Sequence, residues 1–106
     1  MVRLSALERE ALAAFAAAAR SALGDRVRDG RLFGSRARGE GRNDSDLDVL
    51  VRVERLTSDE RRRLQDAGFD VGLAHRLVLS PRVADADSWR PDAPLAVAIA
   101  RDGVAL

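Results

Sequence analysis

The chain has 106 residues and no cysteine, so its length predicts one domain and its composition excludes disulfides, thiolate metal sites and cysteine catalysis. Its 18 basic and 17 acidic residues leave a net charge of +1, which gives no field over the whole surface that would attract a polyanion such as nucleic acid. No signal peptide is convincing and no apolar stretch is long enough to span a bilayer. We therefore expect a single domain over residues 1–106 in the cytoplasm, without a nucleic-acid partner and without membrane attachment.

The first predicted element is an amphipathic helix that begins after Ser5. Ser5 and Glu8 have the Ser-x-x-Glu spacing of a capping box, in which each side chain accepts a hydrogen bond from the backbone of the other. Apolar residues then recur every three to four positions as far as Leu23, and Gly24 ends the helix. The alanine-rich stretch 11–19 lies inside this pattern, so we read it as part of a helix in a water-soluble domain.

Two strands are predicted next, over residues 27–33 and 47–53. The first is weakened by Asp29 and Gly30, so its first half is expected to be irregular. The second alternates strictly, with aliphatic residues at 47, 49, 51 and 53 on one face and Asp48, Leu50 and Arg52 on the other. One face of this strand should therefore be core, and the other should begin with carboxylates.

The remaining elements follow in the second half of the chain. A second capping box at Thr57 predicts a helix that runs towards Phe69. Residues 76–79 predict a third strand, which Pro81 should close, because proline cannot donate to a sheet. A short final helix is expected over residues 95–101.

The loop between the first two strands has the features of a phosphate site. Gly34 can turn sharply and lets the backbone approach a phosphate where a side chain would intrude. Ser35 adds a hydroxyl and its own N–H, and a helix starting here would add further N–H donors and a partial positive charge. Arginines crowd this region, and those inside the loop could offset the charge of a triphosphate: Arg36, Arg38 and Arg42.

Asp46 and Asp48 supply the second half of the predicted site. They are two residues apart on one strand face, where two ionised carboxylates repel unless a cation lies between them. Mg²⁺ fits, because it is commonly held by one or two carboxylates while phosphates and waters complete its octahedron. A competing interpretation is an ordinary polar turn over 43–45 followed by a solvated strand end. The combination of turn, arginines and paired carboxylates between two strands favours the functional interpretation.

This arrangement also resembles a known family. Gly34-Ser35-x-Ala37-Arg38-Gly39, five residues, then Ser45-Asp46-x-Asp48 and an aliphatic strand is similar to the signature of the polymerase-beta-like nucleotidyltransferases, specifically the minimal nucleotidyltransferase family of bacteria and archaea. The resemblance implies an α/β (α+β) nucleotidyltransferase fold, with a small mixed sheet of about three to four strands flanked by helices. It implies magnesium ligands at Asp46 and Asp48, and nucleotide-binding residues at Gly34, Ser35, Arg36, Arg38 and Ser45.

The resemblance further implies a substrate and a partner. The substrate is ATP with Mg²⁺, and AMP passes to a hydroxyl of a partner protein, a small helical HEPN-type toxin encoded nearby that this chain silences as an antitoxin. The alternative is a weak or inactive antitoxin or adaptor that acts by contact. Transfer to RNA or to a small molecule is the weaker possibility, because the chain has no evident acceptor-binding extension. The acceptor, the nucleotide base and the homo- or hetero-oligomeric state stay open.

One expected group is missing from the sequence. The family's chemistry uses a third carboxylate on a later strand, and the corresponding position here is expected at Leu77 or a neighbour, where no acid stands. Three alternatives remain. Asp70 takes its place as a third catalytic residue beside Asp46 and Asp48 if the strand begins earlier, His75 acts as a base or ligand, or the site has two carboxylates and is slow or inactive.

Overall fold

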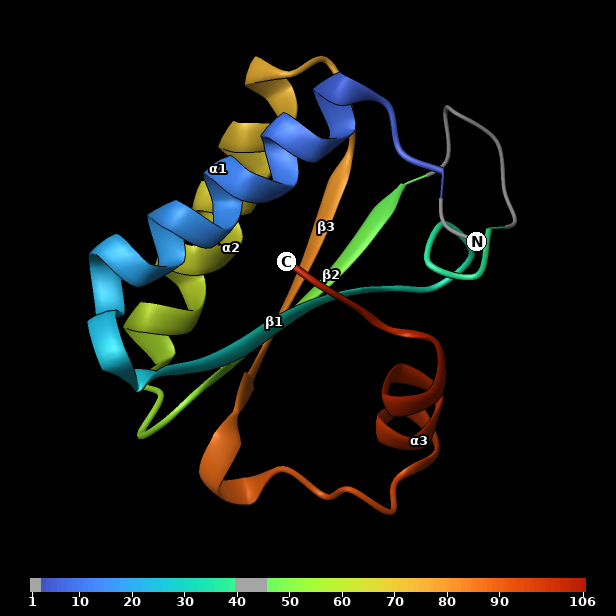
Figure 1. Ribbon diagram of the computed structural model, residues 1–106. Coiled ribbons are helices and arrows are strands. Elements are labelled where there is room, and N and C mark those ends of the chain that lie inside the picture. Colours follow the sequence, from blue (N-terminus) through green and yellow to red (C-terminus); the bar gives the residue numbers. More distant parts are fainter. Residues whose placement is uncertain (1–2, 40–45) are drawn as a thin grey trace.

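A four-stranded mixed sheet lies at the centre of the computed structural model, which describes residues 3–39 and 46–106. The helices and strands follow along the chain as α1 (Ala6–Leu23), β1 (Val27–Phe33), β2 (Leu47–Val53), α2 (Ser58–Ala74), β3 (Leu79–Asp85), α3 (Pro94–Asp102) and β4 (Val104–Ala105), as Figure 1 shows. Short 3-10 turns precede β1 and follow β3. The predicted fold class, a mixed α/β domain with a small sheet, is confirmed.

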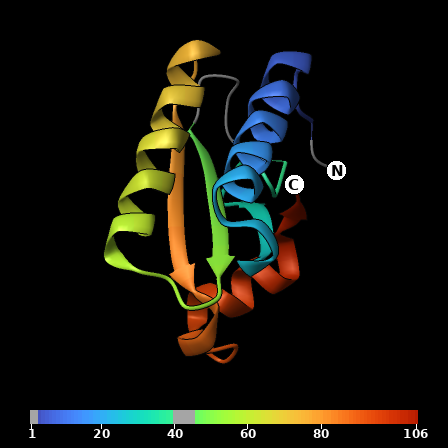
Figure 2. The ribbon, with the colours of Figure 1, turned by 90° about the vertical axis from the view of Figure 1, so that its left-hand side faces the viewer.

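The strand order in the sheet is β3-β2-β1-β4. β1 pairs antiparallel with both β2 and β4, whereas β2 and β3 run parallel. α1 and α2 lie side by side over one face of the sheet, and α3 lies on the other side (Figures 1 and 2). The turn that follows β1, the start of β2, the start of β3 and the beginning of α1 therefore lie at the same end of the sheet (Figure 1).

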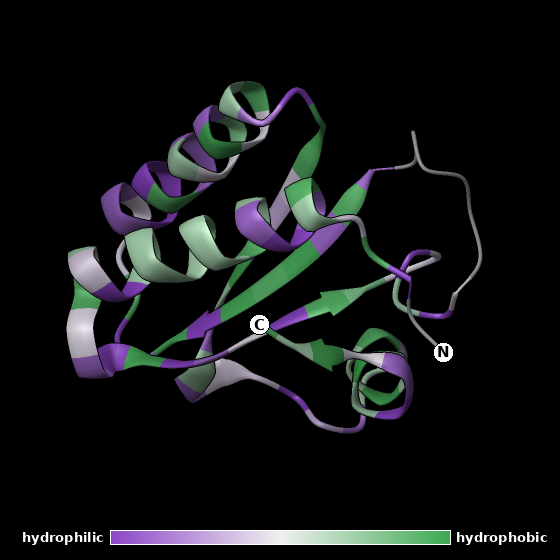
Figure 3. Ribbon diagram, turned by 45° about the horizontal axis from the view of Figure 1, so that its top comes forward, coloured by the Kyte–Doolittle hydropathy of each residue, from purple (hydrophilic) through white to green (hydrophobic). Residues whose placement is uncertain are grey.

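The alternation predicted in the second strand sets which face of the sheet is core. Leu47, Val49, Val51 and Val53 are each at most 1% exposed, and they pack beneath Phe15 of α1 and Leu64 of α2 among other buried residues. Hydrophobic residues dominate β2 in Figure 3. Burying such side chains contributes about 1.5–3 kcal/mol each, so this face holds the layers together. On the other face, Leu50 is buried as well, at 2% exposed, whereas Asp48 at the start of β2 is half-buried.

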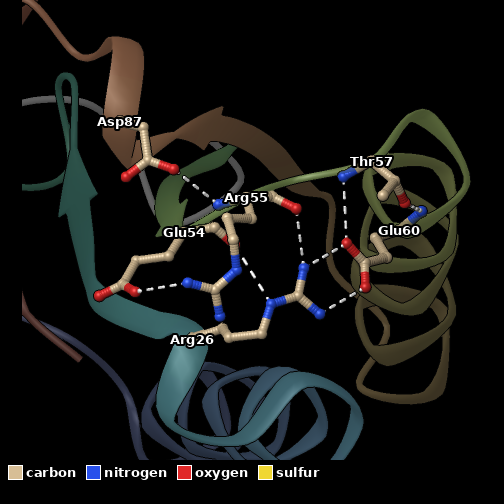
Figure 4. Close-up of polar contacts among 6 residues, drawn as sticks. All are labelled: Arg26, Glu54, Arg55, Thr57, Glu60 and Asp87. Carbon is tan, nitrogen blue, oxygen red and sulfur yellow. Dashed lines mark hydrogen bonds and ion pairs between the residues drawn. The ribbon is translucent and has the colours of Figure 1, made fainter.

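Both predicted capping boxes are present. Ser5 and Glu8 exchange side-chain and backbone hydrogen bonds at the start of α1, and Thr57 and Glu60 do the same at the start of α2. Glu60 also accepts two hydrogen bonds from Arg26, at 2.6 and 2.7 Å (Figure 4). Arg26 donates as well to the carbonyl of Arg55, so one guanidinium ties the entry of β1 to the turn before α2.

The second half of the chain differs from the prediction. α2 continues past Phe69 to Ala74, and β3 begins at Leu79 rather than at residue 76. α2 continues through Gly68 and Gly72. These glycines allow the helix to lie close to β3, since a side chain at Gly68 would approach the Pro81 ring to 2.7 Å. Pro81 lies within β3 instead of closing it, which a strand at the edge of the sheet tolerates.

The last helix forms as predicted, within a residue at each end. β4 was not predicted, and its two residues pair with Arg31 and Leu32 at the edge of β1. None of the helices in the described parts of the chain is long and apolar enough to cross a membrane.

Candidate functional site

The turn after β1 brings the predicted phosphate loop against the carboxylates of β2. Phe33, the last residue of β1, is paired with Asp48 in the antiparallel register, so Gly34 begins beside that aspartate. Gly34 has φ +79°, a conformation that favours glycine. A Cβ added at Gly34 would collide with Oδ2 of Asp48. The residue between the end of the strand and the loop must therefore be glycine for both conformational and steric reasons.

The loop itself is a pair of turns as far as Gly39. The Arg38 N–H donates to the Gly34 carbonyl and the Gly39 N–H donates to the Arg36 carbonyl, each at 3.3 Å. Ala37 is buried in the core cluster, which fixes the middle of the loop to the domain. Ser35 is half-buried beside Gly34, and no helix starts within this described part of the loop. The donors offered to a phosphate here are those of a turn.

Asp46 and Asp48 stand where the sequence predicted them, at the start of β2. Asp46 is exposed and Asp48 is half-buried. Partial burial raises the pKa of the Asp48 carboxyl, and the nearby charge of Asp46 raises that pKa further. A carboxylate with this environment is held in its ionised state by a cation, so the pair is suited to a divalent metal.

The neighbouring position on β3 is occupied by Ser80. In the parallel register Asp48 lies opposite Ser80, so the two side chains share one face of the sheet. The Ser80 hydroxyl donates to Oδ2 of Asp46 at 3.4 Å. The missing acid was expected at Leu77 or a neighbour; Leu77 itself precedes β3 and packs against the core, whereas Ser80 lies opposite Asp48. The residue that could complete the carboxylate pair is a serine.

Asp70 and His75 do not take the place of the absent acid. Asp70 was a candidate only if the strand began earlier, but it lies in α2 with an exposed side chain. His75 follows α2 as its C-cap, and its Nδ1 is 2.7 Å from the carbonyl of Val71. The His75 ring is thus engaged in ending the helix. Within residues 3–39 and 46–106, no third acidic or histidine side chain joins Asp46 and Asp48 in a group that could hold a metal.

The two arginines of the described loop differ in direction. Arg36 is buried, and its Nη2 lies 2.6 and 2.7 Å from the carboxylate oxygens of Glu8 in α1. The prediction that Arg36 offsets phosphate charge is therefore not supported by this geometry, because the guanidinium is directed at α1. Arg38 is exposed and lines a cavity of about 200 Å³ together with Gly34 and Asp102.

Sequence reasoning did not include the contribution of α3 to this cavity. Leu95, Ala98, Ile99 and Asp102 form its far wall. The pKa of Asp102 is lowered by its hydrogen bond from Arg101 and by the charges of Arg101 and Arg38. The sequence shows α3 as an amphipathic helix but carries no signal that places it beside Gly34.

The oxygen donors of this site match those that a divalent metal prefers. In residues 3–39 and 46–106, no group of three or more histidine, cysteine, aspartate or glutamate side chains converges. Two carboxylates and the Ser80 hydroxyl are hard oxygen donors, which match Mg²⁺ when substrate oxygens and water supply the other ligands. The residues present fit the metal. Ser45, predicted to bind nucleotide, and Arg42 lie outside the described residues.

Comparison with known proteins defines the class. The family model described as a nucleotidyltransferase domain matches residues 16–84, which include the turn at Gly34, both aspartates and β3. The chain belongs to this family. A solved structure described as a minimal nucleotidyltransferase is 31% identical, covers 94% of this chain and 92% of its own, and has a TM-score of 0.59. The chain is thus a minimal nucleotidyltransferase.

A second solved structure shows the same fold at lower identity. It is described as a mutant of the toxin–antitoxin pair MntA–HpeT, with 16% identity, 85% coverage of this chain, 68% coverage of its own chain and a TM-score of 0.57. The search of curated proteins gives no match. The predicted family is thus confirmed.

Proposed function

We propose that this nucleotidyltransferase binds Mg-ATP and transfers AMP to a hydroxyl of a partner protein. The observation that carries the proposal is the contact between the two halves of the site: the Gly34 backbone leaves no room for a side chain beside the Asp48 carboxylate. A phosphate bound by the turn is thereby brought to the carboxylates on the same face of the sheet. Positioning and charge neutralisation are the main tasks in phosphoryl and nucleotidyl transfer.

Each group of the site has a task in this proposal. The backbone around Gly34 and the Ser35 hydroxyl hold the β- and γ-phosphates, and Arg38 offsets their charge. Asp46 and Asp48 hold the Mg²⁺, which supplies neutralisation of the developing charge on the phosphates. The half-buried position of Asp48 strengthens this electrostatic contribution, because fewer waters compete there.

The transfer step exchanges one phosphorus–oxygen bond for another. The acceptor hydroxyl oxygen bonds to the α-phosphorus while the bond from that phosphorus to the bridging oxygen of the β-phosphate breaks. Pyrophosphate leaves with the electron pair, and the proton of the hydroxyl passes to water. The turn and Arg38 hold the leaving group, so they act on the side of the bond that breaks.

A partner protein is proposed as the acceptor. The fold is shared with a component of the MntA–HpeT toxin–antitoxin pair. We infer a small helical toxin of the HEPN type, neutralised by modification in the cytoplasm. This partner would bring the acceptor hydroxyl to the carboxylates.

The rival function is an adaptor that neutralises its partner by contact alone. Ser80 is the observation that favours it, since a hydroxyl stands beside Asp48 in the strand register where a third carboxylate would serve the attacking oxygen. A two-carboxylate site binds nucleotide but stabilises the attacking oxygen less well. The two functions share the nucleotide site and differ in whether label is transferred.

The test is incubation with ATP labelled at the α-phosphate and Mg²⁺, with and without the product of the neighbouring gene. We expect label on the partner with the parent protein and none with Asp46→Asn/Asp48→Asn. The double variant Asp66→Asn/Asp92→Asn is the matched control, because it removes the same charge at exposed positions away from the site. No label from the parent, together with full neutralisation by the Asp46→Asn/Asp48→Asn variant, would decide for the adaptor.

A further inference from the structure

A buried ion pair joins the phosphate-type turn to the first helix. Glu8 and Arg36 have side chains that are only 8% and 6% exposed, and their closest oxygen and nitrogen atoms are 2.6 Å apart. Arg36 also donates to the Arg3 carbonyl at 3.2 Å. Glu8 is at the same time the third residue of the helix and accepts the backbone N–H of Ser5 in the capping box. The start of α1 and the turn are thus held by one carboxylate.

The turn has weak restraints of its own. Between residues 34 and 39, the backbone hydrogen bonds from Arg38 to Gly34 and from Gly39 to Arg36 are each 3.3 Å long, slightly beyond the usual range for N–H to oxygen. Gly34 and Gly39, at φ +79° and +75°, border it on either side, and glycine is the residue with the most conformational freedom to lose on ordering. Side-chain anchors must therefore contribute to its shape, and the two buried side chains between these glycines are Arg36 and Ala37.

We propose that the Glu8–Arg36 ion pair positions the turn for phosphate binding, with Arg36 as a positioning residue that does not touch the nucleotide. This inference rests on the proposed nucleotide site at Gly34 and Ser35. The pair sets the turn at one distance from α1, and thereby sets the Gly34 backbone and the Ser35 hydroxyl beside Asp48. The turn meets its ligand already in the bound shape.

A buried ion pair is suited to this task because each of its charges depends on the other for stabilisation. Removing the Glu8 carboxylate takes away the ion-pair partner that lies 2.6 Å from the buried guanidinium, so the Arg36 side chain is driven to reorganise. Arg36 is flanked in sequence by Ser35 and the buried Ala37, so any movement of its guanidinium towards water pulls on the phosphate-binding residues directly. The bound conformation of the turn is then populated only in part, and the apparent nucleotide affinity falls by that fraction.

The chain contains a matched control for this pair at the other end of the sheet. Glu60 is also the third residue of its helix and forms a capping box there with Thr57. It also accepts two hydrogen bonds from an arginine distant in sequence, Arg26. The two glutamates differ in what their arginines hold: a phosphate-type turn for Glu8, and the entry of β1 for Glu60 (Figure 4). Glutamine at either position keeps an oxygen for the cap and removes the charge.

The experiment compares Glu8→Gln with Glu60→Gln in two measurements. Titration calorimetry with Mg-ATP should show a tenfold or larger loss of affinity for Glu8→Gln and a change of less than twofold for Glu60→Gln. Hydrogen exchange without nucleotide should show faster exchange of the amides of residues 34–39 in Glu8→Gln only. Equal affinity and equal exchange of these amides in Glu8→Gln and the parent protein would overturn the inference.

The two readouts separate this inference from the proposed function. A parent protein that fails to bind Mg-ATP contradicts the proposed function, while the exchange of residues 34–39 still supports or overturns the anchoring by Glu8 and Arg36. Loss of affinity in both glutamine variants would show that general loosening of the domain is the cause, and this would overturn the specific role of Arg36.

A second variant covers the case in which Glu8→Gln folds poorly. Glu8→Gln/Arg36→Met removes both charges, so no unpaired charge stays buried and folding should recover. It still lacks the anchor, so we expect thermal stability close to the parent with nucleotide affinity reduced as in Glu8→Gln. If Arg36 contacted the phosphates itself, Arg36→Met would lose far more affinity than Glu8→Gln, and the positioning role would be wrong.

Discussion

Gly34→Ala is the smallest change that tests whether the turn and the carboxylates form one site. The added methyl group meets two obstacles in the structure. Gly34 has φ +79°, where a residue with a Cβ is strained, and the Cβ would collide with Oδ2 of Asp48. The alanine variant should therefore shift the turn, the Asp48 carboxylate or both, and each shift moves a group that the proposed function requires.

The magnitude follows from these two effects. The left-handed conformation costs an L-residue about 1–2 kcal/mol. Turning the Asp48 side chain away from its preferred rotamer adds roughly 0.5–1.5 kcal/mol. We expect the two costs together to lower the free energy of unfolding by about 1.5–3.5 kcal/mol. We also expect at least a tenfold loss of Mg-ATP affinity, equivalent to about 1.4 kcal/mol.

Gly24→Ala is the control, since Gly24 also has a positive φ, +60°, but a Cβ there would meet nothing within 4 Å. Because ψ of Gly24 is −136°, outside the left-handed helical region, the alanine variant should lose about 1–3 kcal/mol of stability from backbone strain alone and keep its nucleotide affinity. Urea denaturation gives the stabilities, and titration calorimetry with Mg-ATP gives the affinities. Gly34→Ala binding as tightly as the parent would refute the reasoning that the turn holds phosphate against Asp48.

Three further predictions concern neighbouring residues. Ser35→Ala should weaken Mg-ATP binding by about 1–2 kcal/mol in titration calorimetry, because one charge-assisted hydrogen bond is lost while backbone donors remain; unchanged affinity would remove the hydroxyl from the site. Ser80→Asp should raise AMP transfer at least tenfold, about 1.4 kcal/mol in the barrier, in the labelling assay, and a rate equal to the parent's would argue against it. The hydrogen bond from Arg26 lowers the pKa of Glu60 to about 2 from 4.5, so the stability advantage of the parent over Glu60→Gln should be full above pH 4.5 and shrink as the pH falls towards 2 in thermal melts. An advantage independent of pH would contradict the pairing.

The first half of the fold follows from local signals in the sequence. The box formed by Ser5 and Glu8 predicts where α1 begins, and the strict alternation over residues 47–53 predicts which face of β2 is core. Because Asp46 and Asp48 follow the same alternation, their common face was predictable as well. These signals are strong because each depends on a few residues that are close in sequence.

The second half depends on contacts between elements that are distant in sequence. Glycine is typical of helix ends, but Gly68 and Gly72 lie within α2, where the close approach of β3 leaves no room for a larger side chain. Pro81 looks like a strand end, but it is compatible with an edge strand, a property of the sheet order that the sequence does not reveal. The sequence predicted the strand over residues 76–79, whereas β3 runs over Leu79–Asp85 and places Ser80 opposite Asp48.

The direction of Arg36 could not be predicted either. A loop arginine beside a phosphate-type glycine is expected to face the ligand, and only the packing of α1 against the turn shows that Glu8 lies closer. Glu8 is recognisable in the sequence as part of the capping box, but that spacing does not indicate its second role as the partner of Arg36. A residue that already has one explained role is easily taken to have no other.

Ser80 decides how far the site can act as an enzyme. Its hydroxyl donates to Asp46 at 3.4 Å, a long hydrogen bond that a metal ligand at Asp46 would replace at little cost. In the proposed function the carboxylate pair and the turn serve the side of the leaving pyrophosphate, whereas the attacking oxygen would meet the neutral hydroxyl of Ser80. Nucleotide binding should therefore survive in this chain with little penalty, and the chemical step should be slow. Either the partner supplies the missing negative charge together with its acceptor hydroxyl, or the bound nucleotide contributes to the contact between this chain and its partner. In the labelling assay the first case gives transfer only when the partner is present.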